Sequence, residues 1–274
     1  HEILKEQFAL NDHLMAVADG VQPGRRKSKF SVLDLWEDSY FQAFRAPTDN
    51  DKSFGNWLAK DWKNQGLDAP QVEVITPETE TQETDGTVSK KSVVEYRYAK
   101  GSIRVSSHYK IYVDGTVDLE QTYLPQGELP ELPRLGSAFV LGEEYENLSW
   151  YGRGPWENYP DRKTSSQYTH YPRPQDSGNH EDVTEVILTN KQGKGVRVTA
   201  IDRPFSFSAL HYTVDDIYKT THDCDLKPRK EVILSLDAAV LGLGNSSCGP
   251  GVLKKYAIDK QKSHTLRVRF SLIK

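Results

Sequence analysis

Paired carboxylates are the first residues whose spacing could support chemistry. Three such pairs occur: Glu143 with Glu144, Asp215 with Asp216, and Asp49 with Asp51. Two carboxylates held a few ångströms apart can act as a general acid and base, or as an acid and a nucleophile. The sequence has 39 acidic residues, however, and pairs arise at that density without a catalytic role. We therefore interpret each pair as structural or solvated.

Residues 150–162 form the most unusual segment, Trp-Tyr-Gly-Arg-Gly-Pro-Trp-Glu-Asn-Tyr-Pro-Asp-Arg. Glycine reaches backbone dihedrals closed to other residues and proline fixes φ, so the segment predicts a rigid, non-repetitive loop. Such a loop presents its aromatic and charged side chains at set angles. We interpret Asp161 and Arg162 as members of an ion-pair or hydrogen-bond network that fixes the loop. A well-packed corner of a β-protein has a similar composition.

The bulk composition argues against several classes of function. The 274 residues carry a net charge of −4, which gives no electrostatic reason to expect nucleic acid or a membrane surface. Histidine and cysteine lack the HExxH and CxxC spacings of zinc sites, so we expect no metal in this chain. Cys224 and Cys248 are expected to be free thiols. Because His1 is not a natural start, we expect a fragment or a processed product, and no compartment is indicated.

The elements that must position these residues are mostly strands. One helix is expected over 56–66, with Asn56 as N-cap, Gly66 as terminator and Trp62 in a core-facing stripe. Strands are expected at 93–98, 183–189, 196–200, 232–236 and 265–272, with a hairpin turn at 190–195. The polar region 76–90 is interpreted as a solvated loop. Many short strands with frequent turns indicate a large antiparallel sandwich.

One hairpin register follows from the alternation of apolar and polar residues at 103–123. A two-residue Asp-Gly loop would place Ile111 beside Asp118 and mix the apolar and polar faces. A three-residue loop, 113–115, restores agreement, with Gly115 in the left-handed position. Lys110 then faces Asp118, and His108 faces Glu120, which are both favourable cross-strand pairs.

Several segments together resemble one known family. Residues 155–162, together with Gly154 before them, resemble GPxENYPDR, and 45–51 (Arg-Ala-Pro-Thr-Asp-Asn-Asp) resembles RAPTDND. Leu-Pro-Arg-Leu-Gly at 132–136, Tyr-Pro-Arg-Pro-Gln at 171–175 with Gly-Asn-His at 178–180, and Phe-Ser-Ala-Leu-His-Tyr at 207–212 also match. The segment 241–250 is similar to a GVGGxxSWGP loop. These motifs occur in the order found in the C-terminal domain of family 2 β-galactosidases.

The resemblance implies a fold, a domain order and a function. It implies a large antiparallel β-sandwich of the galactose mutarotase-like supersandwich type over 30–274. Residues 1–10 would be the last strand of a preceding immunoglobulin-like domain, and 11–29 a linker. The parent would be a bacterial, retaining β-galactosidase. Its two catalytic glutamates would lie in an upstream (β/α)8 barrel that this chain is too short to contain.

The resemblance also assigns roles to residues of this chain. Substrate-side residues would be Asn245, Ser246, Ser247 and Cys248, where Cys248 takes the place of the tryptophan that approaches the aglycone. Cys248 is equally consistent with a buried loop thiol. A shortened mobile-loop counterpart would be Lys52, Ser53, Phe54 and Gly55. Structural motif residues would be Arg45, Asp49, Asn50, Asp51, Glu157, Asn158, Tyr159, Asp161 and Arg162.

The expected partners follow from the same resemblance. They are a β-galactoside bound by the parent enzyme, the upstream barrel and immunoglobulin-like domains, and further copies of the parent in a homo-oligomer. Mg and Na ions would be bound by other domains, and the fragment alone would be inactive. Two alternatives remain: a stand-alone carbohydrate-binding module with Trp36, Trp150 or Trp156 as its platform, and an aldose 1-epimerase-like enzyme using His108 and Glu120.

Overall fold

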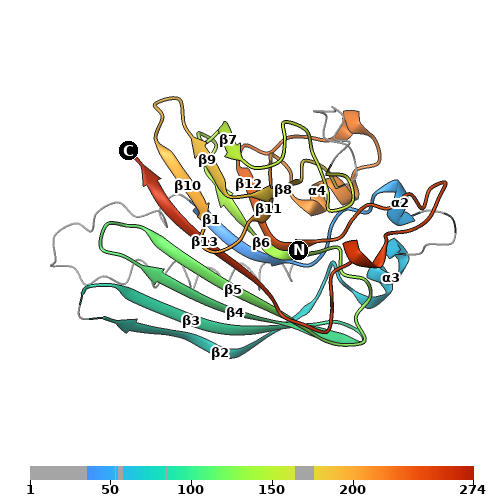
Figure 1. Ribbon diagram of the computed structural model, residues 1–274, viewed down its shortest axis with the longest axis horizontal. Coiled ribbons are helices and arrows are strands. Elements are labelled where there is room, and N and C mark those ends of the chain that lie inside the picture. Colours follow the sequence, from blue (N-terminus) through green and yellow to red (C-terminus); the bar gives the residue numbers. More distant parts are fainter. Residues whose placement is uncertain (1–35, 53, 55–57, 84, 164–175) are drawn as a thin grey trace.

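Two antiparallel sheets face each other across one apolar core (Figure 1). The computed structural model describes residues 36–52, 54, 58–83, 85–163 and 176–274. The predicted strand at 1–10 and linker at 11–29 lie outside these residues. The five-stranded sheet has the order β1-β6-β12-β11-β8 and the eight-stranded sheet the order β2-β3-β4-β5-β13-β10-β9-β7. The all-β antiparallel sandwich expected from the sequence is therefore confirmed.

The strands of the small sheet are β1 Trp36–Gln42, β6 Arg134–Leu141, β12 Val232–Val240, β11 Phe205–Leu210 and β8 His180–Val183. Those of the large sheet are β2 Gln71–Gln82, β3 Val88–Arg97, β4 Gly101–Ile111, β5 Val117–Gly127, β13 His264–Ile273, β10 Gly195–Ala200, β9 Glu185–Thr189 and β7 Asn147–Tyr151. The helices in the described part of the chain are α2 Asp49–Lys52, α3 Leu58–Gln65 and α4 Val214–Lys219, with 3-10 turns η2 Asp223–Asp225 and η3 Lys254–Tyr256.

The predicted β4–β5 register is confirmed. Lys110 pairs with Asp118, and His108 pairs with Glu120. The Tyr112 N–H donates to the Thr116 carbonyl at 2.9 Å, which leaves a three-residue loop. Gly115 has φ +89° within it. Parity thus excluded a two-residue loop, because an even number of loop residues would turn polar side chains into the core.

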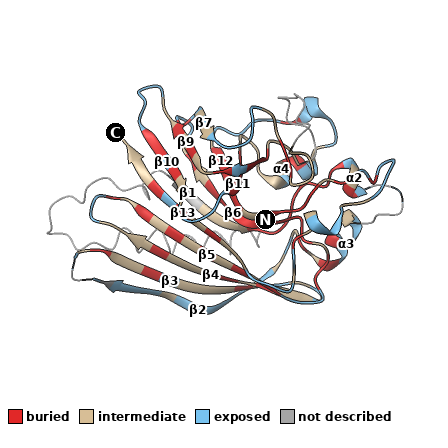
Figure 2. Ribbon diagram, in the orientation of Figure 1, coloured by how far each residue is buried: buried red, intermediate tan, exposed pale blue. Residues whose placement is uncertain are grey.

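Two sequence predictions about strands were wrong. Residues 76–90 are not a solvated loop, since β2 runs to Gln82 and β3 begins at Val88. The polar segment is held by pairing with β3 and by Lys90, whose buried ammonium lies 3.3 Å from the Glu78 carboxylate. Figure 2 shows β2 as an exposed edge strand, where polar side chains face solvent at little cost.

The second wrong prediction concerns 183–189, which is not one strand. The chain breaks at Thr184, so that β8 belongs to the small sheet and β9 to the large one. Asp182 has φ +55° just before the break, a conformation that aspartate tolerates better than most residues. The alternating pattern alone carries no information on which sheet each half joins.

Apolar side chains from both sheets meet in the core. Phe139 of β6 and Phe270 of β13 are fully buried, with ring centroids 5.2 Å apart. The opposite face of the small sheet is also buried but carries small and polar residues, among them Gly136, Ser235 and Asp237. Buried polar side chains need polar partners, and neighbouring strands supply them here: Gln42 of β1 for Ser235, and Arg134 of β6 for Asp237.

The three helices of the described residues lie at one end of the sandwich, beside the loop that follows β12 (Figure 1). The predicted helix is confirmed as α3 and ends at Gly66, which has φ +74°. Trp62 is fully buried, as expected of a core-facing stripe, and its indole N–H donates to the Glu131 carbonyl at 2.6 Å. Asn56 and Trp57 lie outside the described residues. The helical end of the sandwich holds most of the motif residues.

Candidate functional site

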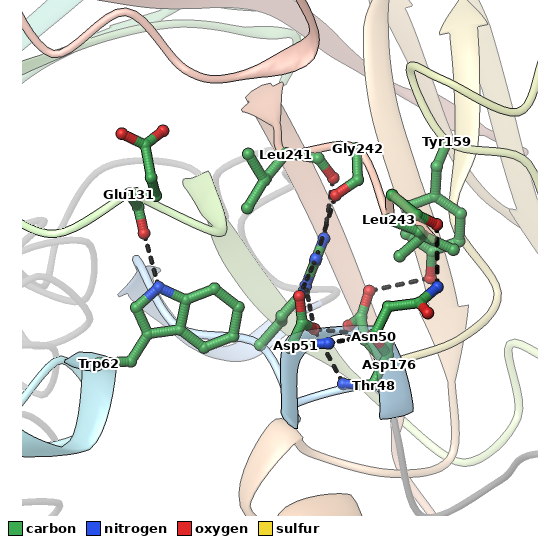
Figure 3. A network of polar contacts seen from close by, with 12 residues as sticks. Thr48, Asn50, Asp51, Trp62, Glu131, Tyr159, Asp176, Leu241, Gly242 and Leu243 are labelled. Atoms are coloured by element: carbon green, nitrogen blue, oxygen red, sulfur yellow. Dashed lines mark hydrogen bonds and ion pairs between the residues drawn. The ribbon is translucent and has the colours of Figure 1, made fainter. Parts of the chain in front are cut away.

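A buried ion pair anchors the candidate site. The Arg45 guanidinium donates to both carboxylate oxygens of Asp51, at 3.1 and 2.7 Å, and both side chains are 0% exposed. Asp51 also accepts hydrogen bonds from the backbone N–H and hydroxyl of Thr48, at 2.8 and 2.9 Å. These bonds close the 45–51 motif on itself and start the short helix α2 (Figure 3).

The same guanidinium reaches the loop that follows β12. Arg45 donates to the carbonyls of Leu241 at 2.8 Å and Gly242 at 3.2 Å. Burial disfavours its charge, but the neighbouring Asp51 carboxylate outweighs this effect and holds the pKa of Arg45 above its ordinary value. The arginine therefore stays charged, and all its bonds are charge-assisted. One residue of the 45–51 motif thus fixes the start of the 241–250 loop.

The 155–162 motif holds the next residues of that loop. The Asp161 carboxylate accepts the backbone N–H groups of Leu243 at 2.9 Å and Gly244 at 2.7 Å. Gly242 passes so close to Asp161 that an added Cβ would lie 2.7 Å from the carboxyl carbon. Only glycine fits at this point, so the sequence pattern Leu-Gly-Leu-Gly has a steric reason.

Arg162 and Asn50 both form hydrogen bonds with residues 244–247 of the loop. Arg162 donates to the Gly244 carbonyl at 2.6 Å and to the Asn245 side-chain oxygen at 3.1 Å. Asn50 donates to the Gly244 carbonyl at 2.9 Å and accepts from the N–H and hydroxyl of Ser247 at 3.1 and 2.6 Å. The hydrogen bonds that Asp161 and Arg162 form with their side chains thus lead to the 241–250 loop, whereas the sequence predicted a network that fixes their own loop.

The end of this loop is a tight turn at the surface, which we call the loop tip (residues 245–248). The Cys248 N–H donates to the Asn245 carbonyl at 3.0 Å, and the Asn245 N–H donates to the Pro250 carbonyl at 2.9 Å. Asn245, Ser247 and Cys248 are exposed, whereas Ser246 is only 4% exposed. The interpretation of Cys248 as a buried thiol is therefore wrong, because the turn places it at the surface. Cys224 is also an exposed free thiol.

The expected mobile-loop counterpart follows α2 directly. Lys52 is exposed, and Phe54 is 93% exposed, which is unusual for a large apolar side chain. Ser53 and Gly55 lie outside the described residues. Asp49 is exposed at the start of the same helix.

A second buried network contacts the 150–162 loop through Tyr159, and it was not predicted from the sequence. Arg134 donates to both oxygens of Asp237, at 3.1 and 2.5 Å. Asp176 lies 3.9 Å from Arg134 and accepts from the Tyr159 hydroxyl at 2.9 Å. A lone aspartate inside the apolar run 232–240 was the available signal, because a buried acid needs a partner.

A third network joins the 155–162 motif to β8. Glu157 accepts from the Gly178 N–H at 2.8 Å, and the Asn158 oxygen accepts from the Glu181 N–H at 2.8 Å. The Glu181 carboxylate accepts from Asn179 and Ser206, each at 2.8 Å. Burial raises the pKa of Glu181 above its ordinary value, although these two hydrogen bonds oppose the shift.

The next residue, Asp182, behaves in the opposite way. Its carboxylate pairs with Lys163 at 2.7 Å and with Arg153. Burial would raise its pKa, but the two basic groups outweigh burial and hold the pKa of Asp182 below its ordinary value. Adjacent carboxyl groups thus have different electrostatic environments.

The acid pairs singled out in the sequence have structural partners. Asp215 pairs with Lys219 at 2.5 Å, and Asp216 accepts the Thr213 N–H in a capping box of α4. Glu143 lies 3.5 Å from Lys230 on the surface. Among the described residues, no group of three or more potential metal ligands converges. Within the same part of the chain, no helix is long and apolar enough to span a membrane.

The residues of the two alternative functions are also tied to neighbours. Trp150 is half-buried against His180 and Phe207, and its indole N–H donates to the Arg153 carbonyl. Trp156 is half-buried as well, and the Trp36 side chain is not described. His108 contacts the Ser89 hydroxyl at 2.7 Å, and Glu120 pairs with Arg267 at 2.8 Å. None of these arrangements favours a sugar platform or an acid–base pair.

Comparisons with known proteins identify the family. The model described as β-galactosidase small chain matches residues 25–272. A β-galactosidase from Kluyveromyces lactis is 30% identical over 250 residues, covering 84% of this chain and 23% of that protein. One from Actinobacillus pleuropneumoniae is 26% identical over 289 residues, covering 99% and 27%. The chain spans about a quarter of the length of the curated relatives it matches.

One solved structure also resembles this chain, but more distantly than the curated relatives do. The galactose mutarotase-like protein from Clostridium acetobutylicum matches with a TM-score of 0.44 and 6% identity, covering 86% of this chain and 78% of that chain. That likeness is too distant to bear on function. The family model, in contrast, spans most of the sequence, including the 45–51, 155–162 and 241–250 motifs that build the site. The chain belongs to the β-galactosidase small-chain family.

Proposed function

We propose that this chain is the C-terminal component of a retaining β-galactosidase that hydrolyses terminal β-galactosides. In this proposal it supplies a scaffold and one wall of the active site. The two catalytic glutamates come from a (β/α)8 barrel in another part of the parent enzyme. Family membership and the names of the relatives support the β-galactosidase assignment.

The observation that carries the wall proposal is the way the 241–250 loop and its tip are held. Arg45, Asp161, Arg162 and Asn50, from two segments distant in sequence, all bind the backbone or side chains of 241–247. A loop needed only to connect two strands does not require so many buried and charged partners. A loop that must meet a substrate at a defined position does, because preorganisation lowers the cost of ordering it on binding.

The chemistry of the tip suggests which part of a galactoside it meets. Cys248 stands where the resembled family has a tryptophan, so this wall lacks an indole face for stacking against the aglycone. Asn245 and Ser247 are exposed beside it and can form hydrogen bonds. We propose that the aglycone is held here by polar contacts rather than by stacking.

An activity assay tests the proposal. The isolated chain should not release nitrophenol from a nitrophenyl β-galactoside, whereas the complete enzyme that contains it should do so. In the complete enzyme, Asp161→Asn should lower kcat/KM about tenfold, since one amide N–H of the loop then faces an NH2 group instead of a carboxylate. Glu143→Gln, on an exposed acid that pairs with Lys230 and makes no bond to the loop tip, is the matched control and should leave kcat/KM unchanged.

Two results would contradict this function. Specific turnover by the isolated chain would place the catalytic acids within it. A complete enzyme inactive on every β-galactoside tested would remove the substrate assignment.

A further inference from the structure

We infer that the loop tip presents hydrogen-bonding groups of fixed polarity: Asn245 is a donor and Ser247 is an acceptor. Asn50 is the positioning residue that makes the Ser247 hydroxyl an acceptor. The inference rests on the proposed function, because it concerns the same galactoside pocket. It adds a specificity: the pocket would favour aglycones that carry hydroxyl groups.

The orientation of the Asn50 amide follows from its partners. Its side chain lies 2.9 Å from the Gly244 carbonyl, and a carbonyl can only accept a hydrogen bond, so the NH2 group must face it. The amide oxygen must then face Ser247, whose backbone N–H donates to it at 3.1 Å. Both ends of the amide are satisfied in this orientation and in no other.

The orientation of Asn50 decides the polarity of Ser247. The Ser247 hydroxyl lies 2.6 Å from the Asn50 oxygen, which cannot donate, so the serine proton is used in this bond. The remaining capacity of the exposed hydroxyl is its lone pairs. A ligand at the tip therefore meets Ser247 as an acceptor, although a serine hydroxyl can in general play either role.

Asn245 has the opposite polarity for a similar reason. Arg162 donates to the Asn245 side-chain oxygen at 3.1 Å, and a guanidinium can only donate. The oxygen is thereby directed toward Arg162. The amide nitrogen of this exposed residue has no hydrogen-bond partner in the described part of the chain. A ligand meets Asn245 as a donor.

The two polarities together match one chemical class of aglycone. Each hydroxyl group of a sugar both donates and accepts, so a sugar aglycone can accept from Asn245 and donate to Ser247. A nitrophenyl aglycone has no hydroxyl group and cannot donate to Ser247. The oxygens of its nitro group are only weak acceptors for Asn245. The tip should therefore discriminate between galactosides through the aglycone and leave the galactosyl part unaffected.

Steady-state kinetics of the complete enzyme test this inference, with lactose and 2-nitrophenyl β-galactoside as substrates. Ser247→Ala and Asn245→Asp should each raise KM for lactose about two- to tenfold, the range expected for one hydrogen bond. The KM for 2-nitrophenyl β-galactoside should change less than about twofold. Ser149→Ala, at an exposed serine on β7, is the control and should leave both values unchanged.

The positioning role of Asn50 needs a double-mutant cycle. Asn50→Ala should raise KM for lactose, and the combined variant should be no worse than the more affected single one, because Asn50 acts on the ligand only through Ser247. Additive effects would show that Asn50 acts independently of Ser247 and would overturn its role. A general loss of folding would instead affect both substrates and lower the urea midpoint.

The outcomes separate this inference from the proposed function. An enzyme that hydrolyses neither galactoside contradicts both. An enzyme that hydrolyses both, but whose Ser247→Ala and Asn245→Asp variants change the two KM values equally or not at all, contradicts only the polarity inference.

Discussion

Two adjacent carboxyl groups, Glu181 and Asp182, have pKa values displaced in opposite directions. Glu181 is buried and its pKa is raised, while Asp182 beside two basic side chains has a lowered pKa. The sequence places them next to each other without any sign of this difference. It arises because β8 directs one side chain toward the covered face of the small sheet and the next toward Arg153 and Lys163.

Glu181 gives a prediction about pH. Because its folded pKa is raised, its contribution to stability is complete below the unfolded pKa, about 4.3, and is lost as pH rises through the folded pKa. Glutamine cannot ionise but keeps an acceptor for Asn179 and Ser206. The free energy of unfolding of the wild type, relative to Glu181→Gln, should therefore fall from pH 4 to pH 8, as measured by urea titration at each pH.

Asp182→Asn is the matched control, with the opposite sign. The lowered pKa of Asp182 contributes stability above its unfolded value of about 3.9, and this contribution is lost as pH falls. The wild type should thus lose stability relative to Asp182→Asn on acidification below about pH 5. Parallel pH profiles for the two variants would contradict the environments assigned here.

Single residues could be assigned only where a motif or a polarity break marked them. Arg45, Asn50 and Asp161 belong to recognisable motifs, yet their partners in the 241–250 loop could not be predicted. Those contacts join residues up to 197 positions apart. Arg134 and Asp237 were missed as a pair, since a charged residue within an apolar run indicates that a partner exists without saying where it lies.

At the level of elements, the alternation of apolar and polar residues predicted those features that depend on pairing between neighbouring strands. The β4–β5 register and the 190–195 turn follow from parity and glycine positions, and both are confirmed. The edge strand β2 was missed because its Thr- and Glu-rich sequence lacks an apolar face. Its pairing with β3 and the buried Lys90–Glu78 contact stabilise it instead. Strand propensity depends on such context more than helix propensity does.

The three-residue hairpin loop gives a prediction about Gly115. Its φ of +89° is strained for residues with a side chain. Gly115→Ala should destabilise the protein by about 1–2 kcal/mol, and Gly115→Asn by less, because asparagine visits the left-handed region more readily. Urea denaturation of the two variants measures the difference. Equal costs would mean that crowding, rather than the backbone conformation, selects glycine here.

At the scale of the whole molecule, three distant segments converge at one end of the sandwich. The segments 45–51, 161–162 and 241–247 come from the beginning, middle and end of the described chain and meet through side-chain to backbone hydrogen bonds. The two sheets act as the frame that brings them together. The position of the loop tip therefore depends on how rigidly the sheets are joined across the core.

The contribution of packing between the two sheets to stability can be measured through Phe139 and Phe270, which contact each other from opposite sheets. Alanine at both positions would cost several kcal/mol each and could exceed the total stability of a domain, so leucine is the better probe. Phe139→Leu and Phe270→Leu should together destabilise the protein by about 0.5–1.5 kcal/mol less than the sum of the single effects, since the aromatic contact is lost only once.

The control cycle combines Phe139→Leu with Ile217→Val. Ile217 belongs to a separate apolar cluster with Ala46 and Leu226. Those two effects should add within about 0.5 kcal/mol, because the residues share no contact. If Phe139 and Phe270 were also additive, the sheets would be held together by many weak contacts rather than by this aromatic pair. The tip would then tolerate core substitutions, and only changes at Arg45, Asp161, Arg162 or Asn50 would displace it.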